Sequence, residues 1–310
     1  MRQLFKLKRF YMFLCVIGFI VFAYKVLELR YDDVDFAKEV NDNYYGYELK
    51  ANRYEAEGQT MRYLEIGCDT LPVLFLIHGS PSSASSWQDL LRDSLMLSHF
   101  YMVAVDRPGY GYSDFGKVQK SIIKQAKMVM PALKAQRGKS DKIMVVGSSY
   151  GGPVAARLGM EYPELMETVL LQSSSMQPKA EKIYAISYPT SKAPLKWLIP
   201  TVFRMANEEK LGHEEALLEM DNDWGKITDP VTIFHGDADD LIYFSNALYA
   251  QEKLVNSAKS FNRAKSSCCS HILFCLPNKA SNSRLGHVIS LVLNARPVLF
   301  NRQLFCSGYK

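Results

Sequence analysis

The sequence predicts an α/β fold: a mostly parallel twisted sheet with helices on both faces. Two observations lead to this prediction. Short, predominantly apolar runs are typical of strands buried on both faces, and they occur at residues 72–77, 100–105, 142–146, 167–172 and 231–234. Stretches with helical spacing of apolar residues separate these runs. Strands that alternate with helices in this way form parallel sheets.

The segment before the first buried run has a different pattern. Residues 44–66 contain two alternating apolar segments, 45–49 and 61–66, which predict two antiparallel strands. Residues 31–43 are acidic and polar, and we expect them to be a linker.

The first 30 residues predict an N-terminal transmembrane helix of the signal-anchor type. Residues 10–24 carry no charge, basic residues precede them, and acidic residues follow from Asp32. The positive-inside rule then places the remainder outside the cytoplasm, as a single-pass protein of the cell membrane with its folded domain on the periplasmic or extracellular side. A cleaved signal peptide, with Val21-Phe22-Ala23 as the cleavage site, and a buried soluble helix remain open alternatives.

Residues 176–226 predict a helical cap. They show helical spacing and several prolines but no buried strand, so we expect them to lie over the carboxyl ends of the strands. The predicted organisation is therefore a segment 1–30, a linker 31–43 and one domain 44–310 that contains the cap.

Gly147-Ser148-Ser149-Tyr150-Gly151 joins a buried run to a helical pattern. A strand that turns sharply into a helix exposes its turn residue, here Ser149, beside the free N–H groups of the helix. The turn His78-Gly79-Ser80-Pro81 ends another strand. The backbone N–H groups of Ser80 and Tyr150 are the candidates for an oxyanion hole.

Candidates for an acid and a base follow in the chain order Ser…Asp…His. Three aspartates (Asp237, Asp239 and Asp240) follow the strand 231–234. His271 lies 32 positions after Asp239, enough for one helix and one strand, and His287 is the rival base.

The other polar candidates have structural interpretations. We expect His78 and His235 to fix their turns, and His99 and His213 to be solvated. An acidic run in the cap is either a solvated face or an anchor for a substrate amine, and it comprises Glu208, Glu209, Glu214, Glu215 and Glu219.

Composition gives no indication of a nucleic-acid partner, a metal or a cofactor. The net charge is +5, but four of the cations lie in the first ten residues, so the remainder lacks a basic face. The six cysteines show no metal-ligand spacing. We expect no metal and no cofactor, and the sequence does not determine the oligomeric state.

Taken together, four motifs resemble the α/β-hydrolase fold superfamily from about Tyr44 to the C-terminus. They are His78-Gly79-Ser80-Pro81, Asp106-Arg107-Pro108-Gly109-Tyr110-Gly111-Tyr112-Ser113, Gly147-Ser148-Ser149-Tyr150-Gly151-Gly152 and His235-Gly236-Asp237-Ala238-Asp239. The resemblance implies that Ser149 is the nucleophile and that Asp239, the fifth residue of His-Gly-x-x-Asp, is the acid. His271 fits the base, although Ser270 stands where the family usually has glycine, and the family's short closing helix is replaced by the polar run 278–284 and the apolar segment 288–293.

The resemblance also implies a reaction class. Epoxide hydrolases and haloalkane dehalogenases of this fold carry aspartate where this chain has Ser149. A serine there implies carboxylic-ester cleavage through an acyl-enzyme, as in carboxylesterases and lipases, with a small-molecule ester or amide as substrate. An aminopeptidase of the proline-releasing type and a non-catalytic binding protein are the alternatives.

Overall fold

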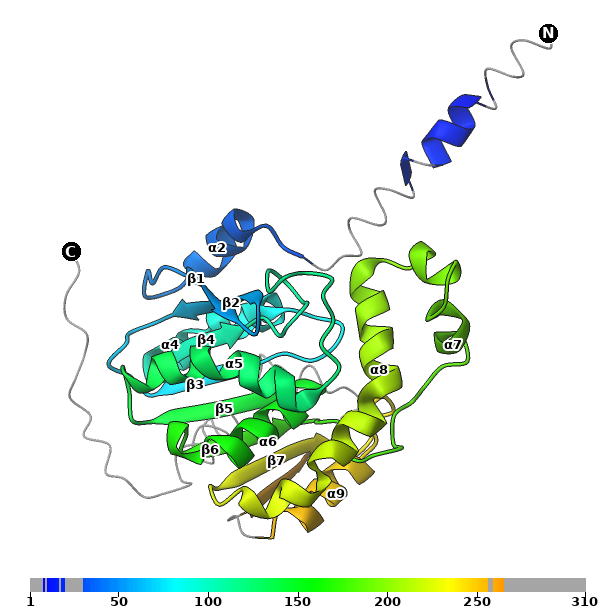
Figure 1. Ribbon diagram of the computed structural model, residues 1–310. Helices are drawn as coiled ribbons and strands as arrows, with labels where there is room; N and C mark the ends of the chain where they lie inside the picture. The colour runs from blue at the N-terminus through cyan, green and yellow to red at the C-terminus, as the bar shows by residue number, and fades with distance from the viewer. Residues whose placement is uncertain (1–7, 9, 17, 20–29, 256–258, 265–310) are drawn as a thin grey trace.

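The computed structural model describes residues 8, 10–16, 18–19, 30–255 and 259–264, and for 259–264 the backbone alone. One eight-stranded sheet forms the centre of the chain, in the order β1-β2-β4-β3-β5-β6-β7-β8 (Figure 1). Neighbouring strands from β4 to β8 are parallel, and β1, β2 and β4 are joined by antiparallel pairing. The strands are β1 Lys50–Ala56, β2 Gln59–Ile66, β3 Val73–Ile77, β4 Tyr101–Val105, β5 Ile143–Ser148, β6 Thr168–Gln172, β7 Val231–Gly236 and β8 Lys259–Ala264.

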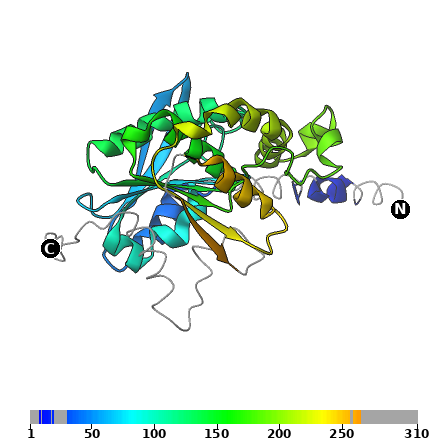
Figure 2. The same ribbon diagram turned by 90° about the horizontal axis from the view of Figure 1, so that it is seen from below.

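Helices cover both faces of this sheet, as the sequence predicts (Figure 2). One face packs against α5 and α6, and the other against α2, α3 and α4. The helices are α2 Asp33–Asn41, η1 Ala84–Trp87, α3 Gln88–Leu91, α4 Ser94–His99, α5 Ile122–Arg137, α6 Gly151–Glu161, η2 Pro163–Leu165, α7 Ser187–Thr190, η3 Leu195–Leu198, α8 Thr201–Met220, η4 Asp221–Lys226 and α9 Ser245–Lys253.

The central strands form where the sequence is apolar without interruption. Every residue of β3 is buried, with Val73, Phe75 and Ile77 facing one helix layer and Leu74 and Leu76 the other. Because successive side chains of a strand point to opposite faces, only a strand covered on both sides needs such a run. The sheet thereby brings the carboxyl ends of β3, β5, β6 and β7 to one edge.

The segment 31–43, which the sequence suggests as a linker, contains a helix, since residues 33–41 form α2. The carboxylate of Asp32 caps the helix by accepting from the N–H groups of Val34 and Asp35. Phe36 and Val40, four residues apart, are both buried in the core on the α3–α4 side. The first expected antiparallel strand is also misplaced: β1 is Lys50–Ala56 and does not overlap the alternating segment 45–49.

Residues between β6 and β7 form the cap, whose helices are α7, η3, α8 and η4. The long helix α8 buries Val202 and Met205 against Tyr110 of the loop after β4. Figure 1 shows α8 running along one side of the sheet with α7 outside it. The predicted domain boundaries themselves stay a prediction.

Among the residues that the structure describes, no helix is long and apolar enough to cross a membrane. Most of the predicted transmembrane segment, including residues 20–29, lies outside that described part.

Candidate active site

Ser149 occupies a strained turn between β5 and α6. Its φ of +52° lies in the left-handed region, which residues other than glycine seldom adopt. Two hydrogen bonds hold the turn: the Ser149 N–H donates to the carbonyl of Gln172, and the Gly152 N–H donates to the carbonyl of Ser149. The half-buried Ser149 side chain therefore stands at the N-terminal end of α6, where the helix dipole favours negative charge.

The glycines around Ser149 are required by close backbone contacts. A Cβ atom at Gly147 would lie 2.4 Å from the carbonyl oxygen of Gly151, and one at Gly151 would lie 2.3 Å from that of Ile77. Both separations are impossible for real atoms, so β3, β5 and α6 can meet at this point only with glycine present.

The turn after β3 lies directly against Ser149. A Cβ atom at Gly79 would come within 2.9 Å of the Ser149 Cβ atom. The next residue, Ser80, and the helix-capping residue Tyr150 each have a backbone N–H that donates no hydrogen bond within the described residues. Free N–H groups beside an exposed hydroxyl are suited to bind an oxyanion.

Asp239 lies just beyond the end of β7 and is buried. Its Oδ1 atom accepts from the N–H groups of Leu241 and Ile242, at 3.0 and 2.9 Å. Asp237 is half-buried and Asp240 exposed. Asp239 is thus the buried aspartate at this strand end, and two backbone N–H groups orient its carboxylate.

A pocket of about 280 Å³ joins these groups. Ser80, Ser149 and Tyr150 line it, as do Leu241 and Ile242, whose N–H groups hold Asp239. From the segment between β6 and β7 its lining includes Glu181, Tyr184, Phe203, Ala206, Asn207 and Lys210. The volume accommodates a small organic substrate.

A fully buried ion pair lies beneath the pocket and connects the core to the cap. The Arg107 guanidinium donates to both carboxylate oxygens of Glu209 in α8, at 2.8 and 3.2 Å, and neither side chain is exposed. Arg107 also donates to the carbonyls of His78 and Gly79 in the oxyanion turn. Burial disfavours the charged guanidinium, but Glu209 together with Tyr110 and Tyr150 outweighs this and raises the pKa of Arg107.

Tyr110 extends this network to the oxyanion turn. Its hydroxyl donates to Glu209 at 2.6 Å and lies 2.8 Å from the hydroxyl of Ser80. The pairing of Arg107 with Glu209 was not expected from the sequence. The signal was present at Arg107, because a charged residue directly after a buried strand requires a buried partner.

Two expectations for the cap are wrong. Glu209 does not belong to a solvated face and is not free to bind a substrate amine, since Arg107 holds it. His213 is fully buried rather than solvated: its Nε2 atom lies 3.0 Å from the carbonyl oxygen of Ser175, and its ring packs on Tyr150. Burial lowers the pKa of His213, and the nearby carboxylate of Glu181 opposes this effect.

His78 is buried in the turn after β3, as expected, whereas the buried His235 lies within β7 and not in the turn that follows it. The Nε2 atom of His78 accepts from the N–H of Arg107, and its Nδ1 atom lies 2.7 Å from the carbonyl oxygen of Gly79. The Nε2 atom of His235 lies 2.8 Å from the carbonyl oxygen of Ile242. Burial lowers the pKa of both rings. The two candidate bases, His271 and His287, lie outside the described residues, so the assignment of the base stays a prediction.

Comparison with known proteins agrees with this architecture. Residues 72–198 match the family model of the alpha/beta hydrolase fold. A putative lipase from Acinetobacter baumannii has a TM-score of 0.59 at 19% identity, covering 88% of this chain and 96% of its own. A membrane phospholipase A described as a bacterial virulence factor has a TM-score of 0.59 at 18% identity, covering 96% of this chain and all of its own.

Among curated sequences, epoxide hydrolase 4 of Mus musculus is 30% identical over 124 residues, which are 38% of this chain and 33% of that protein. The chain spans about half or less of the length of such relatives. The family match over residues 72–198 and the likeness to these solved structures show that the chain has the α/β-hydrolase fold.

Proposed function

We propose that the chain is a serine hydrolase that cleaves carboxylic esters through an acyl-enzyme. The observation that carries this proposal is the position of Ser149, in a strained turn that lines the pocket, beside two N–H groups that donate no hydrogen bond within the described residues. Similarity to an epoxide hydrolase does not extend the proposal to epoxides, since the enzymes of that kind in this fold carry aspartate at the elbow.

In the proposed reaction, the Ser149 hydroxyl attacks the ester carbonyl after losing its proton to a histidine base. We propose His271 for this base and Asp239 for the group that orients its ring and stabilises the imidazolium. The N–H groups of Ser80 and Tyr150 hold the oxyanion, at about 2.7–4 kcal/mol for each donor in comparable sites. Water then releases the acid and regenerates Ser149.

The test is hydrolysis of p-nitrophenyl esters in a chain-length series. Ser149→Ala should lower kcat/KM by at least about 10³-fold. Ser148→Ala, which changes the adjacent half-buried serine, should retain activity and serves as the matched control. Equal activity of wild type and Ser149→Ala would exclude the proposed nucleophile.

An aminopeptidase of the proline-releasing type is a second candidate, favoured by one carboxylate in the pocket wall. Glu181 lines the pocket, where Ser175 donates to it and Lys210 lies 3.8 Å away. If Glu181 anchors a substrate amine, Glu181→Gln should raise KM for free aminoacyl amides and leave KM for their N-acetylated forms unchanged.

We also propose that residues 1–30 anchor the domain on the extracytoplasmic side of the cell membrane. The uncharged run 10–24 and the basic residues before it support this. An anchored chain should resist carbonate extraction and be accessible to external protease. The intact mass of the isolated protein distinguishes the two alternatives, because an anchor stays part of the protein and a cleaved signal peptide does not.

A further inference from the structure

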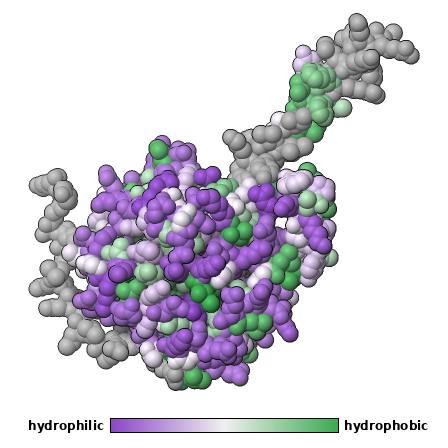
Figure 3. Space-filling view, viewed as in Figure 1, coloured by the Kyte–Doolittle hydropathy of each residue, from purple (hydrophilic) through white to green (hydrophobic). Residues whose placement is uncertain are grey.

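The outer part of the cap exposes large apolar side chains that have no role in the core. Between β6 and α8, the most exposed of the large apolar side chains have exposed fractions from 42% to 73%, and they are Tyr184, Ile186, Tyr188, Leu195, Trp197 and Leu198. They lie on α7, on η3 and beside them, and are called the cap tip below. Figure 3 shows hydrophobic side chains at this edge of the molecule, where Figure 1 places α7.

The charge of the cap tip has one sign. From residue 182 to residue 207 the sequence holds four basic residues, Lys182, Lys192, Lys196 and Arg204, and no acidic residue. Exposed aromatic and aliphatic side chains interspersed with lysines are typical of surfaces that dock on lipid, where apolar groups enter the interface and lysines contact anionic headgroups.

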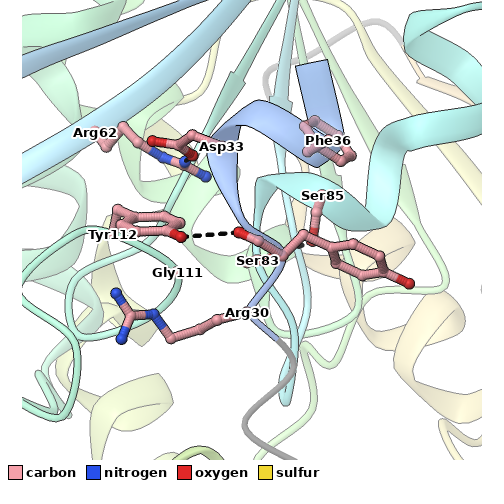
Figure 4. A pocket seen from close by; sticks show the side chains of 9 residues that line it. Arg30, Asp33, Phe36, Arg62, Ser83, Ser85, Gly111 and Tyr112 are labelled. Atoms are coloured by element: carbon pink, nitrogen blue, oxygen red, sulfur yellow. Dashed lines mark hydrogen bonds and ion pairs between the residues drawn. The ribbon is translucent and has the colours of Figure 1, made fainter. Parts of the chain in front are cut away.

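The chain also enters the folded domain beside the cap tip. Arg30, the first residue described after the N-terminal apolar segment, lies 4.5 Å from the ring centroid of Tyr112 and 4.6 Å from that of Phe115. In Figure 4, Arg30 and Arg62 lie on opposite sides of the Tyr112 ring. Phe115 in turn packs against the cluster of Tyr110, Val202 and Met205, and Val202 lies at the start of α8, directly after η3.

We infer that the cap tip docks on the surface of a lipid bilayer that contains anionic headgroups. The sign of its charge and its position beside the entry of the uncharged N-terminal segment both favour lipid over a second protein chain. The pocket borders the cap tip, because Tyr184 belongs to the cap tip and also lines the pocket. A consequence, which rests on the proposed function, is that ester substrates reach Ser149 from the bilayer.

The chain carries its own reporter for this docking. Of its three tryptophans, Trp87 and Trp224 are 3% exposed and Trp197 is 64% exposed. The difference in fluorescence emission between wild type and Trp197→Phe is therefore the emission of Trp197, which lies in the cap tip. The full-length protein is mixed with phosphatidylcholine vesicles, with or without phosphatidylglycerol, whose acyl chains carry bromine as a quencher.

Docking predicts that brominated anionic vesicles quench more than half of the Trp197 emission and that added salt weakens the effect. Lys192→Glu with Lys196→Glu should weaken docking by about fivefold or more per lysine. The matched control, Leu248→Ser, changes a residue 50% exposed on α9, and should leave quenching unchanged.

Two results would overturn the inference. One is Trp197 emission that brominated lipid does not change while the protein is bound to the vesicles. The other is protection of Trp197 from acrylamide that rises with protein concentration without lipid, which would assign the cap tip to a second copy of the chain. Neither readout depends on ester hydrolysis, so a failure here is distinguishable from a failure of the proposed reaction.

Discussion

Removing the charge of Glu209 should destabilise the fold and the oxyanion turn together. In Glu209→Gln the Arg107 guanidinium loses its only described ion-pair partner while remaining fully buried. The carbonyls of His78 and Gly79 and the amide oxygen of Gln125 still accept from it, but none of them carries a full charge.

The expected cost follows from this geometry. Removing one partner of a buried ion pair typically costs 3–5 kcal/mol, because the remaining charge is left uncompensated in a medium of low polarity. The substituted amide can still accept one hydrogen bond from Arg107, so we expect about 3 kcal/mol. Activity should fall as well, since Arg107 and Tyr110 both contact the turn that carries Ser80.

Equilibrium unfolding in urea, with ester hydrolysis measured in parallel, tests this prediction. The matched control is Glu208→Gln, the neighbouring carboxylate on α8, which lies 3.9 Å from the half-exposed Lys120. An exposed pair of this kind contributes at most about 1 kcal/mol. Equal effects of the two substitutions would refute the assignment of Arg107 and Glu209 as the connection between core and cap.

Three further predictions concern single residues. Gly151→Ala should lower the free energy of unfolding by about 1–3 kcal/mol and abolish activity, because the new Cβ would overlap the Ile77 carbonyl. Gly212→Ala in α8 should instead raise the free energy of unfolding by about 0.5–1 kcal/mol, and urea unfolding measures both changes. Since burial lowers the pKa of His213, the unfolded state binds its proton more readily; stability should fall as pH drops below about 6.5, and His213→Asn should flatten that dependence. If the base is His271, His271→Ala should abolish ester hydrolysis and His287→Ala should not; the reverse result would reassign the base.

The central sheet could be predicted from the sequence because strands that are buried on both faces consist mostly of apolar residues. The strand feeding Ser149 is apolar throughout, and its glycines could be interpreted from the turn they permit. Helix α2 was harder to predict, since its two buried residues, Phe36 and Val40, stand among acidic and polar ones. A pair of apolar residues four apart is too short a pattern to outweigh that composition.

The cap network could not be predicted from local pattern. Glu209 lies in a run of charged residues that is typical of an exposed helix face, and its burial depends on Arg107, about a hundred positions earlier in the chain. The same holds for His213, which is buried only because α8 packs over Ser175 and Tyr150. Such pairings arise from the tertiary fold.

The identity of the nucleophile is tested most directly by covalent labelling of the purified full-length chain with a fluorophosphonate. Peptide mass mapping should find one phosphonyl adduct, on Ser149, and Ser149→Ala should take up none. An unlabelled wild-type protein, or labelling that persists in Ser149→Ala, would contradict the proposed serine-hydrolase mechanism.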